Sequence, residues 1–192
     1  MKKLLLMSLI TLASFALFAQ KREGVSYGVK AGIAFPHIPS SIGSHDAITS
    51  FYVGGTVSVP VRSYKSSFLS VQPGLTLINK GVLEKNPNRE FSTSYLEIPV
   101  NLMAHFDGGG GSKFFVGAGP YVAIALASKE PKDAPIKSYI KPLDFGFNFL
   151  LGYQIKNGFS INGSYGFGLT PMGYYNVPDK NSVLSVGLGY SF

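Results

Sequence analysis

The sequence contains no cysteine, which excludes a disulfide framework and any metal site built on thiolates. Charged residues are scarce and make up 14% of the chain. After the first 19 residues, no segment has the unbroken apolar run of about 20 residues that a membrane-spanning helix requires. At 192 residues, the chain has the length of one domain. Any stable fold must therefore come from a single domain without helical spans or covalent cross-links.

The N-terminal segment has the pattern of a secretory signal peptide. Two lysines precede an apolar stretch at residues 4–18, which is too short for an ordinary spanning helix. Ser14-Phe15-Ala16 offers a small-x-small cleavage site, and cleavage after Ala19 is the alternative, although it places the large Leu17 at the −3 position. An uncleaved anchor helix is the alternative. We expect residues 1–19 to be removed on export and residues 20–192 to form the domain.

Loss of the two N-terminal lysines would lower the formal charge from +7 to +5, with 15 basic residues against 10 acidic ones. Most of this excess lies in predicted loops and turns. No basic stripe alternates with aromatic residues on which bases could stack, so nucleic acid is not an expected partner. A modest positive charge is better suited to an anionic membrane surface.

Large apolar residues alternate with small or polar residues at a period of two through the rest of the chain, as in β-strands. In the clearest segment, large apolar residues at every second position alternate with Asp144, Gly146 and Asn148. The segments are about 10 to 13 residues long, which is long for a globular strand but suits a tilted membrane span. Eight of them are predicted: 25–35, 49–61, 68–78, 95–106, 113–127, 143–155, 159–169 and 181–192.

The predicted connections alternate in length. Those after the second, fourth and sixth segments are short, and the last contains Asn157-Gly158, a strong hairpin signal. Those after the other segments are long, and residues 79–93 form one of them. An even number of strands with short turns at one end and long loops at the other is typical of outer-membrane barrels, and both termini then lie in the periplasm. Four prolines fall within strands, where we expect bulges: Pro60, Pro73, Pro99 and Pro120.

A soluble barrel or sandwich is the competing fold, because alternation does not say which face is inside. A soluble sheet presents charged side chains to water, whereas here the polar face is mostly glycine, serine and asparagine. Small residues fit the narrow lumen of an eight-stranded barrel. Aromatic residues near strand ends suit interfacial girdles. They are Tyr27, Phe35, Phe51, Phe106, Phe114, Tyr153, Phe159, Tyr190 and Phe192. We predict an all-β, eight-stranded antiparallel up-and-down transmembrane β-barrel in the outer membrane.

Two stretches carry a family resemblance. "SVQPGLTLINKG" contains Gln72-Pro73, and the later "SYLEIPVNLMAHF" contains the motif at residues 95–99. These motifs, with the later "FFVGAGPYVA" and "DFGFNFLLGYQI", resemble the PorT-like outer-membrane barrel family of Bacteroidetes-type bacteria. The resemblance implies the barrel fold and the outer membrane, and it suggests an accessory role in a protein secretion system. The final strand, with Tyr190 and Phe192, resembles the signal read by the outer-membrane assembly machinery.

Inward-facing polar residues are the candidate site. A carboxylate in a narrow lumen is costly unless it is paired, so we predict that Lys30 meets the two inward acids. The predicted lumen network consists of Lys30, Gln72, Glu97, Asn101, Tyr121, Asp144 and Asn148. Its expected role is to fill and stiffen the barrel, and a gate or a narrow ion path is the alternative. A wide pore is not expected with eight strands.

Catalysis is not expected. Some small outer-membrane barrels modify lipid A with His and Ser residues, and the first long loop holds His37, His45 and Asp46 beside several serines. Proximity within a loop shows no catalytic geometry, and no rigid ligand spacing supports a metal site. The "GGGG" at residues 108–111 precedes a strand rather than a helix, so it predicts a turn and not a phosphate cradle.

The predicted long loops carry basic residues that could meet lipid A phosphates. These are Lys80, Lys85, Arg89, Lys129, Lys132, Lys137 and Lys141. The alternative is that they are solvated loop charges. We therefore expect a monomeric, non-enzymatic outer-membrane barrel without cofactor. Its expected partners are lipid, lipopolysaccharide at the loops and the assembly machinery during biogenesis. Secretion-system proteins are the further alternative, as are a narrow channel and, most remotely, a lipid A-modifying enzyme.

Overall fold

The computed structural model describes residues 24–37, 45–46, 48–85, 88–129, 142–170 and 180–192. Within them no helix is long and apolar enough to cross a membrane. The expected signal peptide and much of three predicted loops lie outside the described residues. The strands are β1 (Ser26–His37), β2 (His45–Asp46), β3 (Ser50–Ser63), β4 (Ser67–Lys85), β5 (Asn88–Gly109), β6 (Ser112–Lys129), β7 (Leu143–Gln154), β8 (Phe159–Gly168) and β9 (Ser182–Ser191).

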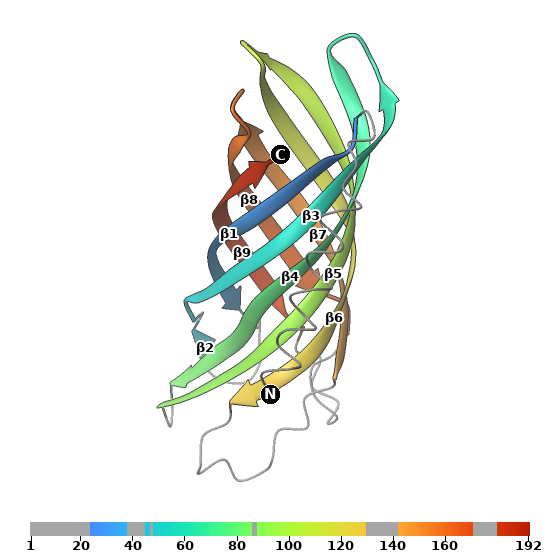
Figure 1. The fold of residues 1–192 in the computed structure, drawn as a ribbon. Coiled ribbons are helices and arrows are strands. Elements are labelled where there is room, and N and C mark those ends of the chain that lie inside the picture. The colour runs from blue at the N-terminus through green and yellow to red at the C-terminus, as the bar shows by residue number, and fades with distance from the viewer. Residues whose placement is uncertain (1–23, 38–44, 47, 86–87, 130–141, 171–179) are drawn as a thin grey trace, which may run out of the picture.

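Eight of these strands close into one antiparallel barrel, which confirms the predicted fold class (Figure 1). Each long strand pairs with its neighbours in sequence, and β1 also pairs with β9, which leaves no open sheet edge. The two-residue β2 lies outside this ring and pairs with β4. Closure gives each strand of the ring a hydrogen-bonded neighbour on both sides, as a lipid environment requires.

The barrel has two distinct ends. We call the end with the short connections after β3, β5 and β7, where β9 also ends, the turn end; it lies uppermost in Figure 1. The opposite end is the loop end. At the turn end, Gly109, Gly110 and Gly111 have φ values of 81°, 61° and 84°, and Gly158 has 93°. Such angles strain any residue with a Cβ, so the predicted glycine turns are confirmed.

The β4–β5 hairpin corrects the predicted loop over residues 79–93. Both strands continue past most of the other strands at the loop end, with β6 beside β5 (Figure 1), and Lys80 is paired to Thr93 and Glu84 to Arg89. The polar residues there suggested a loop. The ladder nevertheless continues, because each strand satisfies the backbone of the other outside the barrel wall. β4 and β5 are therefore 19 and 22 residues long.

Large apolar side chains cover the outside of the barrel, as the alternation predicted. Val100 is 45% exposed, Leu151 64% and Leu188 66%. Aromatic residues pack against one another on this face near the turn end, where the ring centroids of Phe114 and Tyr153 are 4.6 Å apart. This outer surface is far too apolar for contact with water and matches a lipid-facing wall.

Small residues line the inside because large rings lie across them. The ring of Tyr52, on β3, lies against Gly32 of β1 and Gly187 of β9, where an added Cβ would collide with its atoms. Its hydroxyl donates a 3.0 Å hydrogen bond to Oδ1 of Asn162, on β8. The side chain of Tyr52 therefore reaches from β3 across β1 and β9 to β8. The glycines give the lumen room for a few large polar side chains.

The prolines in strands have two outcomes. At Pro60 the β3–β4 register shifts before Arg62, so the expected bulge is confirmed there. Bulges at Pro73, Pro99 and Pro120 were a wrong prediction, because the register on either side of each is unchanged. Pairs beside these prolines drop out of the β4–β5 and β5–β6 ladders, so a missing donor is accommodated by a local gap rather than an extra residue.

Candidate functional site

The centre of the lumenal network is Lys80, which is 1% exposed. Its Nζ lies 3.1 Å from Oε2 of Glu97 and 3.2 Å from Oδ2 of Asp144. Both carboxylates are also largely buried, with side-chain exposures of 10% and 7%. One cation therefore bridges two acids from different strands in a site with little access to solvent.

Strand register brings the two acids together. Glu97 on β5 and Asp144 on β7 are both paired with Ala123 on β6, so the three residues form one row across the wall. Ala123 is fully buried and leaves space above this row. Lys80 lies on β4, beyond the end of the row, and its long side chain reaches back to both carboxylates.

Neighbouring polar groups complete this cluster. The hydroxyl of Tyr121 donates a hydrogen bond of 3.2 Å to Oδ2 of Asp144 and accepts one of 3.4 Å from Lys80. Asn148 Nδ2 donates to Glu97 Oε1 at 3.0 Å. Asn181, which the sequence reasoning did not select, donates to Asp144 Oδ2 at 3.4 Å. These hydrogen bonds offset part of the hydration that the ion cluster loses on burial, although Oδ1 of Asp144 has no hydrogen-bond partner in the described part of the chain.

Lys80 is the residue that sequence reasoning missed, because it was placed in a long loop whose basic residues contact lipopolysaccharide or are solvated. Its side chain instead occupies the place predicted for Lys30. The alternation carried the signal, because Lys80 has the same parity as the inward residues Thr76 and Ile78. Ending the third strand at residue 78 concealed it.

Lys30 does point into the lumen, but it lies away from this cluster. Within the described residues, no carboxylate oxygen lies within 4.0 Å of its Nζ. Its ammonium group lies 5.9 Å from the centroid of the Tyr52 ring. Lys30 and Glu97 line the same small cavity of about 30 Å³. With Lys80, Glu97 and Asp144 it gives this part of the lumen two lysines and two acids.

The remaining predicted residues lie near the middle of the lumen. Gln72 on β4 is paired with Asn101 on β5. Asn101 is 2% exposed, and its Oδ1 has no hydrogen-bond partner among the described residues. Asn101 lines the 30 Å³ cavity and Gln72 lines a second, larger cavity. The 30 Å³ cavity is large enough for about one water molecule, which could satisfy Asn101.

A separate hydrogen-bonded chain lies nearer the turn end. Ser58 donates to Ser70 at 3.0 Å, and Ser70 Oγ lies 3.0 Å from Nε2 of His105. Phe68 stacks on the His105 ring, with centroids 4.2 Å apart. The arrangement superficially suggests a nucleophile and a base. However, Ser70 has no exposed surface and Nδ1 of His105 has no orienting partner in the described part of the chain.

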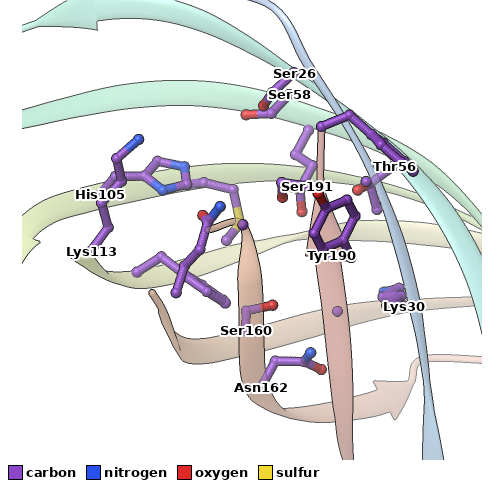
Figure 2. A pocket seen from close by; sticks show the side chains of 18 of the residues that line it. Ser26, Lys30, Thr56, Ser58, His105, Lys113, Ser160, Asn162, Tyr190 and Ser191 are labelled. Atoms are coloured by element: carbon purple, nitrogen blue, oxygen red, sulfur yellow. The ribbon is translucent and has the colours of Figure 1, made fainter. Parts of the chain in front are cut away.

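The larger cavity, of about 380 Å³, lies at the turn end of the lumen (Figure 2). Lys30 lines both cavities and thus marks the boundary between them. Lys113, His105, Ser160 and Asn162 are among the side chains around the larger one. No group of three or more metal-ligating His, Cys, Asp or Glu residues occurs among the residues with described positions.

The predicted assembly residues and the first two histidines lie at opposite ends of the barrel. Tyr190 and Phe192 lie at the turn end, with ring centroids 5.0 Å apart in an edge-to-face arrangement. His37 ends β1, and His45 and Asp46 form β2. The serines between these histidines lie outside the described residues, as do Lys132, Lys137 and Lys141.

Similar solved structures support the fold. The chain is 15% identical to the outer membrane enzyme PagL, covering 86% of this chain and 98% of that one, with a TM-score of 0.52. It is 14% identical to Neisserial surface protein A, covering 88% and 98%, with a TM-score of 0.51. For OprG from Pseudomonas aeruginosa the identity is 12%, the coverage 87% and 95%, and the TM-score 0.50. At these identities the likeness concerns the fold alone.

No curated protein matches the sequence. The family model described as "Outer membrane protein beta-barrel domain" matches residues 18–173, most of the chain. This match agrees with the closed barrel, its apolar outer wall and its polar lumen. The protein is thus a small eight-stranded outer-membrane β-barrel that belongs to the outer membrane protein β-barrel domain family.

Proposed function

We propose that this protein is a non-enzymatic barrel with a closed, non-conducting lumen and a structural or accessory role in the outer membrane. The observation that carries the proposal is the buried cluster of Lys80, Glu97 and Asp144 toward the loop end of the lumen. A passing ion would have to break two ion pairs and several hydrogen bonds in a poorly hydrated site. Breaking such a cluster is costly, so the cluster acts as a plug.

The cavities support the same conclusion. The space beside the plug is only about 30 Å³, whereas the open cavity at the turn end is about 380 Å³. Around the plug, Lys30 and Lys80 balance Glu97 and Asp144 in formal charge, so no strong field of one sign draws ions through this narrow part of the lumen. Eight strands leave an interior just wide enough for side chains, in agreement with this arrangement.

Planar-bilayer recording of the refolded full chain tests the proposal. We expect no steady channels from wild type, and none from Glu97→Gln, because Lys80 still binds Asp144 in that variant. A refolded porin in the same bilayer serves as the positive control. Steady currents in wild type that Glu97→Gln alters would instead favour a narrow ion or solute channel.

The absence of catalysis is also part of the proposal. The serine and histidine that approach each other, Ser70 and His105, are buried and lack an orienting acid among the described residues. We expect no fluorophosphonate labelling of the folded barrel and unchanged lipid A in cells that overproduce it. Labelling of a serine, or a changed acyl pattern, would instead support the lipid A-modifying alternative.

The surroundings of the barrel complete the proposal. We propose that the turn end faces the periplasm, that Tyr190 and Phe192 guide assembly, and that basic residues at the loop end contact lipopolysaccharide. The PorT-like motifs leave an accessory role in protein secretion as the alternative. Isolation under mild detergent separates these two. A lone heat-modifiable monomer supports the structural role, and stoichiometric recovery with secretion components supports the accessory role.

A further inference from the structure

The cavity of about 380 Å³ at the turn end has an unusual distribution of charge. Its lining includes the lysines Lys30, Lys113 and Lys156, but no aspartate or glutamate side chain among the described residues. The two acids of the lumen are held by Lys80 on the other side of Lys30. The cavity is thus a cup with a cationic lining, whereas the plug beyond it, with one lysine and two acids, has a formal charge of −1.

Lys30 provides the specific feature of this cup. It lies where the two lumenal cavities meet, at the inner end of the larger one. No carboxylate oxygen of the described residues lies within 4.0 Å of its Nζ, in contrast to the two such contacts of Lys80. An ammonium group without an ion-pair partner in a narrow lumen is unfavourable, and the Tyr52 ring, with its centroid 5.9 Å away, offers only a weak cation–π contact. An anion entering from the turn end would supply an ion-pair partner.

The walls of the cup are rich in hydrogen-bonding groups. Figure 2 shows Thr56, Ser160 and Asn162 around the cavity near Lys30, on strands β3 and β8. His105 also lines the cavity, is 7% exposed, and carries a buried Nδ1 atom with no partner in the described part of the structure. Hydroxyl, amide and imidazole groups of this kind recognise the hydroxyls of a polar ligand.

Aromatic rings complete the lining on one side. Phe68 and Phe115 both border the cavity, and Lys113 Nζ lies 5.2 Å from the centroid of the Phe68 ring. The volume falls within the range of about 300–1,000 Å³ that is usual for small-molecule sites. A bare phosphate ion would leave most of this space and most of these groups without contact.

We propose that the turn-end cavity binds a small hydroxylated anion of the sugar phosphate class. Its charged group lies against Lys30, its hydroxyls meet the polar walls, and Lys113 at the opening attracts it electrostatically. This inference concerns a binding site and does not depend on the closed lumen proposed above. It requires only that the cup opens at the turn end.

Isothermal titration calorimetry of the refolded full chain in uncharged detergent tests this site with three probes: glucose 6-phosphate, glucose and inorganic phosphate. We expect saturable binding of glucose 6-phosphate that weakens as salt is added, and weaker binding of the other two. Lys30→Gln should reduce the affinity for glucose 6-phosphate at least about tenfold, because a charge-assisted contact is lost. Lys65→Gln is the matched control, since Lys65 is exposed and does not line the cavity.

Lys113→Gln, at the opening, should lower the affinity about two- to fivefold, and it tests the site if Lys30→Gln fails to fold. Heat-modified mobility on a gel shows folding in each case. The proposal is overturned if wild type binds none of the probes at millimolar concentration, or if both lumenal variants bind like Lys65→Gln. Equal affinities for inorganic phosphate and glucose 6-phosphate would show that the polar walls do not recognise the sugar hydroxyls, and would overturn that part of the proposal.

Discussion

Replacement of Lys80 by methionine is the sharpest test of the lumenal cluster. Methionine keeps a similar length and an apolar stem but removes the ammonium group. In wild type that group lies 3.1 Å from Glu97 and 3.2 Å from Asp144, and it donates to the Tyr121 hydroxyl. The Lys80→Met variant leaves two carboxylates facing each other in a buried site without their cation.

The size of the effect follows from these distances. Both acceptor oxygens lie within 3.2 Å of one nitrogen, so they are no more than about 6 Å apart. At that separation and an effective dielectric constant of about 20, two like charges repel by about 3 kcal/mol. Removing one partner of a buried ion pair costs about 3–5 kcal/mol in other proteins. We therefore expect Lys80→Met to lower the free energy of unfolding by about 3–5 kcal/mol.

Urea unfolding of the barrel in lipid vesicles measures this loss. The chain contains no tryptophan, so the folded fraction is best followed by circular dichroism and by heat-modified mobility on a gel. The midpoint and slope of the transition give the free energy of unfolding. The slope should not change, because the variant exposes the same surface on unfolding.

Lys30→Met is the matched control, because Lys30 is a lumenal lysine with no carboxylate within 4.0 Å in the described structure. It should cost no more than about 1 kcal/mol, since no buried acid loses its partner. The triple variant Lys80→Met, Glu97→Gln, Asp144→Asn should recover most of the loss, because no buried charge remains. If Lys80→Met were no less stable than Lys30→Met, the assignment of the cluster as the plug would be refuted.

Other variants test packing, orientation and the cross-lumen contact by the same unfolding assay. Gly146→Ala places a Cβ against a tyrosine ring and should lower the free energy of unfolding by about 1–3 kcal/mol. Gly163→Ala is the control, because the nearest atom to its added Cβ is 3.8 Å away, and it should change the free energy of unfolding by less than about 0.5 kcal/mol. Val186→Arg, on the outer wall, should lower the free energy of unfolding by about 2–4 kcal/mol if lipid covers that face. Ser66→Arg, in a turn, should cost close to nothing, and equal costs for the two variants would contradict the membrane orientation. Tyr52→Phe removes a 3.0 Å hydrogen bond and should cost about 1 kcal/mol, and an unchanged midpoint would show that this bond contributes nothing.

The faces of the strands could be read from the sequence because each residue in a strand points to the opposite side from its neighbour. That rule correctly placed Glu97 and Asp144 in the lumen and Val100 and Leu188 on the outer wall. Turn chemistry added the hairpin at Asn157, and the count of strands gave the closed barrel. These features depend on residues close together in the chain.

Partners across the lumen could not be read in the same way. Alternation makes Lys30 and Lys80 equally inward, but only strand tilt and stagger decide which one reaches the height of the acids. The extent of β4 also depends on pairing with β5, which stabilises polar residues as strand beyond the barrel wall. The sequence by itself determined which side chains face inward, because that depends on local geometry. Only the tertiary structure decided that Lys80 pairs with the acids and that Lys30 lines an open cationic cup, because register joins residues far apart in the chain.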